Sequence, residues 1–217
     1  MYKIILFDLD GTLSDSEPGI RKGIEYSLSK FGIKLEDEEI NKFLGPPIRD
    51  SYRDFCGFDE DKCEQAVKYY REYYAEKGLF ENTLYPGMRE LLCGLKDRGK
   101  ILMVATSKPQ PFTDRILRYF EIDGLFDIIV GASMDGSRDR KADIIRFALS
   151  EYGDDALENL SWALMVGDRK YDILGAREVG IDSVGALYGY GSVEELKSAG
   201  ATYLSETVEG ILEYALK

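Results

Sequence analysis

The feature that most constrains this chain is the repeated alternation of short, continuous apolar runs with longer amphipathic stretches. Runs that are apolar throughout, rather than at every second position, are typical of parallel strands covered on both faces. Helical patterns such as Met88–Leu95 and Ile144–Leu149 separate the runs. The order therefore predicts an α/β fold with a parallel, doubly wound sheet and right-handed crossovers. The predicted strands are Lys3–Phe7, Ile101–Ala105, Asp127–Val130, Ala163–Val166 and Ser183–Leu187.

One segment interrupts this alternation directly after the first predicted strand. Its apolar residues keep helical spacing, as at Ile20 and Ile24, and no convincing strand is present. A chain of 217 residues has room for one large domain with a smaller insert. We therefore expect a core made of residues 1–15 and 82–217, and an all-helical insert of residues 16–81.

Composition excludes several classes of function. The net charge is −12, from 28 Lys and Arg against 40 Asp and Glu, which disfavours nucleic acid and anionic membranes as partners. Histidine is absent. Catalysis by Ser-His-Asp or Cys-His, histidine general bases and histidine-ligated zinc are therefore excluded together.

The cysteines and the N-terminal segment bear on location. Cys56, Cys63 and Cys93 form no CxxC pair, and such a sparse, odd number favours thiols in a reducing compartment. The first residues lack the apolar region of a signal peptide, and no window reaches the roughly 18 apolar residues of a membrane span. We expect a cytoplasmic protein without a membrane segment, present as a monomer or a homodimer.

Polar residues follow each predicted strand of the core. Because ligands of open parallel sheets bind at the carboxyl ends of the strands, we expect these side chains to meet at one edge. The residues concerned are Asp8, Asp10, Thr106, Ser107, Lys108, Lys141, Asp168 and Asp172.

The charges at this edge constrain its ligand. We count four carboxylates against one lysine at this edge, and two like charges about 4 Å apart repel by about 4 kcal/mol at an effective dielectric constant near 20. Such a cluster must hold protons or bind a cation. With oxygen ligands only, Mg²⁺ is the natural candidate, and a metal with open coordination positions attracts a phosphate dianion.

Four motifs resemble those of the haloacid dehalogenase-like superfamily in its phosphatase form. Asp8–Leu13 (DLDGTL) resembles the first motif, Val104–Pro109 (VATSKP) the second, Lys141 the third and Gly167–Asp172 (GDRKYD) the fourth. The position of the helical insert is similar to that in the subclass with a helical cap after the first motif. The resemblance covers the whole chain, and it implies a Rossmann-like core with an inserted cap.

The resemblance also implies the catalytic roles. Asp8 would be the nucleophile that forms an aspartyl-phosphate, and a carboxylate needs no activating base at neutral pH. Asp10 would be the general acid for the leaving alkoxide and then the base that activates water. Thr106 would donate a hydrogen bond to the phosphoryl group, and Lys141 would neutralise nucleophile and phosphate together.

The metal site implied by the resemblance holds Mg²⁺ among four aspartates. Asp8, the backbone carbonyl of Asp10, and Asp168 would ligate the ion, and Asp172 would support the site directly or through water.

The roles of several neighbouring residues have two possible interpretations from the sequence. Ser107 and Lys108 either flank the phosphate or cap the chain before Pro109. Arg169 either reaches the phosphate or is solvated. Arg49, in the loop after Gly45, either binds a substrate carboxylate or second phosphate, or is an exposed residue at the start of a helix.

We therefore expect a Mg²⁺-dependent phosphatase that hydrolyses a small phosphorylated metabolite of phosphoglycolate or nucleotide type. A phosphohexomutase similar to β-phosphoglucomutase is one alternative, but it would need further cap cations besides Arg49 to hold a second phosphate. A non-enzymatic phosphoacceptor, such as a signalling receiver domain, is another. Receivers lack an acid at the position of Asp10 and lack a cap. A catalytically inactive binding protein is disfavoured by the intact motifs.

Overall fold

The computed structural model describes residues 1–217, and the chain divides into two compact units. The core unit comprises Met1–Asp15 and Leu84–Lys217, and the helical unit comprises Ser16–Thr83. The chain leaves the core unit after β2 (Ser14–Asp15) and returns at β3 (Thr83–Leu84).

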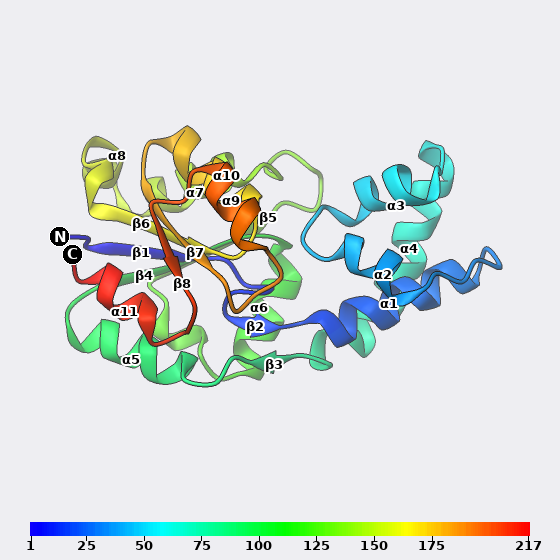
Figure 1. Ribbon diagram of the computed structural model, residues 1–217, viewed down its shortest axis with the longest axis horizontal. Coiled ribbons are helices and arrows are strands. Elements are labelled where there is room, and N and C mark those ends of the chain that lie inside the picture. Colours follow the sequence, from blue (N-terminus) through cyan, green and yellow to red (C-terminus); the bar gives the residue numbers. More distant parts are fainter. The chain divides into compact units, whose positions relative to one another are not determined.

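The core unit contains a six-stranded sheet in the order β5-β4-β1-β6-β7-β8, and every neighbouring pair is parallel (Figure 1). From β1 the chain first builds outward through β4 and β5, and then through β6, β7 and β8 on the other side. The point where the direction reverses is therefore at β1, where open α/β sheets bind their ligands. The strands are β1 (Ile4–Phe7), β4 (Ile101–Pro109), β5 (Ile128–Ala132), β6 (Ala163–Gly167), β7 (Asp182–Ala186) and β8 (Tyr203–Ser205).

Helices cover both faces of this sheet, which confirms the predicted α/β class. On one face, α7 (Lys141–Tyr152) and α9 (Lys170–Val179) pack on alternate strand residues such as Leu6, Met103 and Met165. On the other lie α5 (Met88–Asp97) and α11 (Gly210–Ala215) (Figure 1). The other elements of the core unit are α6 (Gln110–Tyr119), η3 (Asp123–Leu125), α8 (Asp154–Glu158), η4 (Leu160–Trp162) and α10 (Val193–Ala199).

A bulge in β4 changes the register beside β1. Ala105 pairs with Val130 of β5, whereas Pro109 pairs with Ala132, so β4 uses four residues where β5 uses two. Bulges of this kind redirect side chains next to functional sites. The extra residues include the predicted site positions Thr106 and Lys108.

The helical unit is built around the packing of α1 (Glu17–Ser29) on α4 (Glu60–Glu76). Tyr26 of α1 packs against Tyr73 of α4 with ring centroids 5.7 Å apart, and within α4 the rings of Tyr70 and Tyr74 stack 5.1 Å apart. A Cβ atom at Gly19 would lie 2.0 Å from the carbonyl oxygen of Gly78, so only glycine permits this approach. Its elements are α1 (Glu17–Ser29), α2 (Asp37–Ile40), η1 (Asn41–Phe43), α3 (Ile48–Cys56), α4 (Glu60–Glu76) and η2 (Gly78–Phe80). None of the protein's helices combines the length and apolar composition needed to cross a bilayer.

Candidate active site

The turn after β1 places two aspartates at the centre of the sheet edge. Asp8 continues the strand, and its N–H donates to the carbonyl oxygen of Val166 in β6 at 2.9 Å. Gly11, with φ +77°, then lets the chain reverse, and its N–H donates to the carbonyl oxygen of Ser14 at 2.8 Å. The strand end and this tight turn fix the backbone on both sides of Asp10.

Lys141 is the first residue of α7 and joins two of the aspartates. Its buried Nζ lies 2.9 Å from Oδ1 of Asp8 and 2.7 Å from Oδ1 of Asp172, and it donates to the carbonyl oxygen of Ala105 at 3.1 Å. Burial alone would lower the pKa of Lys141, but the carboxylates of Asp172 and Asp8 outweigh it and hold the pKa above its ordinary value. Lys141 is therefore charged at neutral pH.

Asp168, directly after β6, is held by donors from two distant segments. Its Oδ1 accepts a hydrogen bond from the hydroxyl of Thr12 at 3.1 Å, and its Oδ2 accepts one from the backbone N–H of Tyr190 at 2.8 Å. Complete burial, followed by the charges of Asp172 and Asp8, raises the pKa of Asp168 well above its ordinary value. The carboxyl group is thus oriented by two hydrogen bonds, while its burial disfavours the charged form.

Asp172 lies in the first turn of α9, where it caps the helix. Its Oδ2 accepts the backbone N–H of Arg169 at 3.1 Å, while its Oδ1 faces Lys141. Burial raises the pKa of Asp172 to about 6, although the charge of Lys141 acts to lower it, and the charge of Asp8 adds a smaller contribution that raises it. A Cβ atom at Gly167 would lie 2.5 Å from Oδ2 of Asp172, so a glycine at the end of β6 is needed for this approach.

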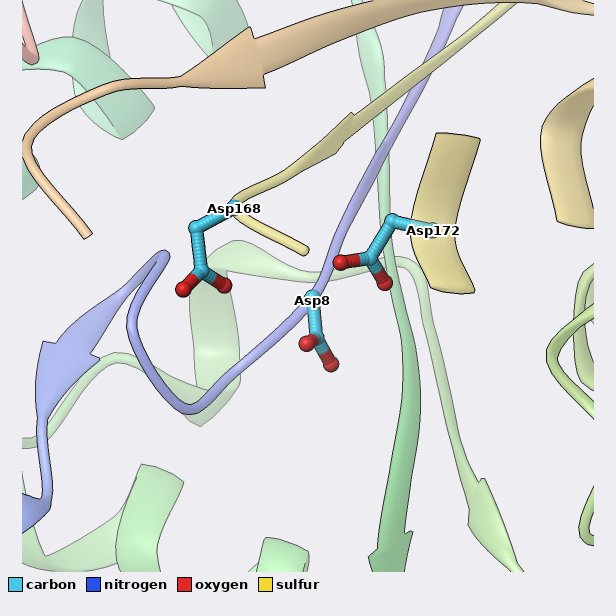
Figure 2. Close-up of side chains that lie close together, drawn as sticks. All are labelled: Asp8, Asp168 and Asp172. Atoms are coloured by element: carbon cyan, nitrogen blue, oxygen red, sulfur yellow. The ribbon is translucent and has the colours of Figure 1, made fainter. Parts of the chain in front are cut away.

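These three aspartates fit a hard divalent cation. Asp8, Asp168 and Asp172 each offer a carboxylate oxygen, and the three oxygens lie within 4.8 Å of one another (Figure 2). The Oδ1 atoms of Asp8 and Asp172 are buried, and although Lys141 is near, neither accepts a hydrogen bond of suitable geometry. Unsatisfied buried carboxylate oxygens in a group are what Mg²⁺ requires of a protein site.

The bulge of β4 gives its three polar residues different surroundings. Thr106 is buried, and its Oγ1 accepts the backbone N–H of Lys108 at 3.2 Å, whereas Ser107 is exposed. The side chain of Lys108 turns inward, with its Nζ 2.8 Å from Oδ2 of Asp10. The carboxyl group of Asp10 therefore faces a lysine and is not part of the three-aspartate cluster.

The two arginines considered from the sequence have carboxylate partners. Arg169 Nε lies 2.9 Å from Oε1 of Glu195 in α10, so this guanidinium is paired rather than merely solvated. Arg49 belongs to the helical unit, where its guanidinium bonds to Glu60 and lies 3.3 Å from Oε1 of Glu64. A contact between Arg49 and substrate stays a prediction.

Sequence reasoning missed the residues that hold Asp168 in place. Thr12 and Tyr190 donate to it, and a Cβ atom at Gly189 would lie 2.7 Å from its Oδ2. Tyr190 acts through its backbone, which no side-chain pattern reports. The alternating Tyr188–Gly191 segment (YGYG) directly after the fifth predicted strand was the available signal, because paired glycines mark close approaches of the backbone.

Comparison with known proteins agrees with this geometry. A family model described as haloacid dehalogenase-like hydrolase matches residues 5–186. The chain is 41% identical to a 5'-nucleotidase of Pseudomonas aeruginosa over 93% of this chain and 90% of that protein. It is 38% identical to the tyrosine-protein kinase PtkA of Mycobacterium tuberculosis, over 94% of this chain and 68% of that protein.

Among solved structures, a predicted phosphatase from Clostridium acetobutylicum superposes with a TM-score of 0.92. The two are 46% identical, and the match covers 100% of this chain and 99% of the other. Fold, site and relatives together define an enzyme of the phosphatase class. Because the family model spans most of its length, the chain belongs to the haloacid dehalogenase-like hydrolase family.

Proposed function

We propose that this protein hydrolyses small phosphomonoesters in the presence of Mg²⁺, through a phosphoryl group carried transiently on Asp8. The observation that carries the proposal is the position of Lys141, whose Nζ lies 2.9 Å from Asp8 and 2.7 Å from Asp172. A fixed cation beside a nucleophile at the switch point of the sheet suits the transfer of a dianionic phosphoryl group.

In the first half-reaction, an oxygen of Asp8 attacks phosphorus and the bond to the leaving alkoxide breaks. Lys141 offsets the negative charge that Asp8 and the phosphoryl group bring together, and Thr106 donates a hydrogen bond to a phosphoryl oxygen. Asp10, two residues beyond the nucleophile, gives a proton to the leaving oxygen. In the second half-reaction, Asp10 takes a proton from water, which attacks phosphorus and restores Asp8.

Mg²⁺ would be held by Asp8, Asp168 and the backbone carbonyl of Asp10, with Asp172 supporting the site. When bound, the ion supplies positive charge that offsets the carboxylates and orients the phosphoryl oxygens. The protein's own part is to keep the carboxylates in place. Thr12 and Tyr190 orient Asp168, and Lys141 holds Asp172.

The names of the relatives and the ion pairs of Arg49 support a particular class of substrate. A relative at 41% identity is named 5'-nucleotidase, and others are named phosphoglycolate phosphatase and pyrophosphatase, which supports a small phosphorylated metabolite. A phosphohexomutase would need free cations in the helical unit to hold a second phosphate. Arg49, the candidate for that role, is bonded to two glutamates. We therefore favour transfer to water, with nucleoside 5'-monophosphates as the first substrates to test.

The direct experiment measures phosphate release from p-nitrophenyl phosphate and from a panel containing nucleoside 5'-monophosphates, 2-phosphoglycolate and hexose phosphates. Hydrolysis should require Mg²⁺ and stop on addition of EDTA. Calcium should inhibit, because its larger and looser coordination misplaces the nucleophile. Full activity in EDTA would remove the metal from the proposal, and phosphate transfer between sugar positions without release would favour the mutase.

A further inference from the structure

A second buried lysine lies at the site, and the motif roles above leave it unassigned. Lys108 follows Thr106 and Ser107 in the bulge of β4, where Ser107 is exposed and Lys108 is buried. Burying a lysine is costly unless its charge is paired. Its position therefore calls for a partner at the site.

The backbone of Lys108 is fixed on both sides. Its N–H donates to Oγ1 of Thr106 at 3.2 Å, and its carbonyl oxygen accepts a hydrogen bond from the hydroxyl of Thr113 in α6 at 3.2 Å. A Cβ atom at Gly131 of β5 would lie 2.6 Å from the same carbonyl oxygen, so any larger residue there would displace it. The direction of the Lys108 side chain is thus set by the bulge and its neighbours.

The partner of Lys108 is Asp10. Nζ lies 2.8 Å from Oδ2, and the side chains are 5% and 21% exposed. The other carboxyl oxygen, Oδ1, is buried and has no hydrogen-bond partner. One oxygen of Asp10 is therefore held by the lysine, while the second keeps its capacity for a further hydrogen bond.

We propose that Lys108 is a positioning residue for Asp10: by holding Oδ2, it directs Oδ1 to the oxygen of the leaving group and then to the attacking water. The inference rests on the proposed function, in which Asp10 exchanges protons with both oxygens. Lys108 and Lys141 then have different roles, since Lys141 pairs with the nucleophile Asp8 and Lys108 pairs with Asp10, which acts as acid and base. This division predicts that loss of Lys108 affects proton transfer rather than phosphate binding.

Substrates with different leaving groups distinguish an effect on proton transfer from an effect on phosphate binding. p-Nitrophenolate departs without a proton, whereas an alkoxide needs one, so only alkyl phosphates depend on a well-placed acid. We compare kcat/KM of wild type and Lys108→Met, both with Mg²⁺, for p-nitrophenyl phosphate and for a nucleoside 5'-monophosphate or another alkyl phosphate that the wild type hydrolyses. General acid catalysis is worth roughly 10²–10⁴-fold, so the loss for the alkyl substrate should exceed that for p-nitrophenyl phosphate by about tenfold or more.

A double-mutant comparison tests whether Lys108 acts through Asp10. With the alkyl substrate, Asp10→Asn with Lys108→Met should be no slower than Asp10→Asn alone, because the second change removes support from a group already disabled. Lys108→Arg, which keeps the charge, should recover part of the rate. Lys96→Met is the matched control, since Lys96 also pairs with an aspartate at 2.8 Å, Asp127, but lies outside the site. This variant should leave kcat/KM unchanged for both substrates.

Equal losses on the two substrates would overturn the inference and make Lys108 a phosphate-binding residue, and so would additive losses in the double variant. If thermal unfolding shows that Lys108→Met is not folded, the same ratio is measured with Lys108→Gln, and an unchanged ratio there overturns the inference as well. Failure of the proposed function looks different, because Asp8→Asn would then keep its activity whatever residue stands at position 108.

Discussion

Lys141 Nζ lies 2.7 Å from Oδ1 of Asp172, although one side chain comes from α7 and the other from α9. The two helices approach so closely at this point that a Cβ atom at Gly175 of α9 would lie 2.7 Å from Cγ of Lys141. A glycine is therefore needed there. The same ammonium lies 2.9 Å from Asp8, at the end of β1. One buried cation therefore ties the central strand to two helices, and both the stability and the chemistry of the core unit depend on it.

Replacement of Lys141 by Met should lower both stability and activity. The change leaves two buried carboxylates facing each other without a cation, and breaking a buried ion pair in this way costs roughly 3–5 kcal/mol. Urea denaturation in EDTA measures the loss, and added Mg²⁺ should restore part of it by binding the carboxylates that have lost their lysine partner. Lys96→Met, at a pair whose side chains are each 33% exposed, is the control and should cost under about 1 kcal/mol. Equal unfolding free energies for wild type and Lys141→Met would contradict the assignment.

Asp8→Asn should abolish turnover while leaving the fold intact. Asparagine keeps the shape of the side chain but is not a nucleophile, so no phosphoryl-enzyme can form. Removing one negative charge from a crowded cluster should, in addition, leave the thermal midpoint in EDTA unchanged or raise it. The measurement is kcat with p-nitrophenyl phosphate, together with a thermal melt. A variant that keeps more than about a hundredth of the wild-type rate would show that another group attacks phosphorus.

The parallel sheet could be predicted from the sequence because its strands are apolar throughout. Five of the six strands were located within one to a few residues, since burial on both faces leaves a continuous apolar run such as Ile4–Phe7. Strand β8 was missed, because Tyr203–Ser205 is short, half-polar and lies at the edge of the sheet. The bulge that lengthens β4 to Pro109 was missed as well, because it depends on pairing with β5.

Within the candidate site, the grouping of Asp8, Asp168, Asp172 and Lys141 could be predicted, because all follow strands whose carboxyl ends share one edge. The pairing of Lys108 with Asp10 could not, since the inward turn of the lysine is set by the bulge. The count of four carboxylates against one lysine, made from the sequence, therefore left out the positive charge that Lys108 brings to the site.

The pH dependence of stability should reveal the buried carboxyl group of Asp172. Its pKa is raised from 3.8 to about 6 in the folded protein, so between about pH 4 and about pH 6 the folded state binds more protons than the unfolded state. Its contribution to the unfolding free energy therefore falls as the pH rises through this window. The stabilisation is present below it and lost above it. The pKa of Asp168 is raised as well, and it acts with the same sign.

The measurement is the urea midpoint of metal-free wild type and of Asp172→Asn, taken at intervals across this window and at neutral pH. Other carboxylates contribute in both directions, so the difference between the two proteins is the informative quantity. The variant lacks this titration, and its stability relative to wild type should increase as the pH rises. A difference that stays constant with pH would show that Asp172 titrates with its ordinary pKa.

Gly189→Ala should weaken Mg²⁺ binding without changing any ligand. An alanine Cβ would lie 2.2 Å from the carbonyl oxygen of Gly11 and 2.7 Å from Oδ2 of Asp168, so the loop must move and the hydrogen bond from the N–H of Tyr190 must lengthen. Residues that orient metal ligands typically contribute about 10–100-fold in affinity, and we expect a loss of that order by calorimetric titration. Gly124→Ala is the matched control, since nothing lies within 4 Å of its Cβ position. Unchanged affinity in a folded Gly189→Ala protein would mean that the Tyr188–Gly191 segment does not hold Asp168 for the ion.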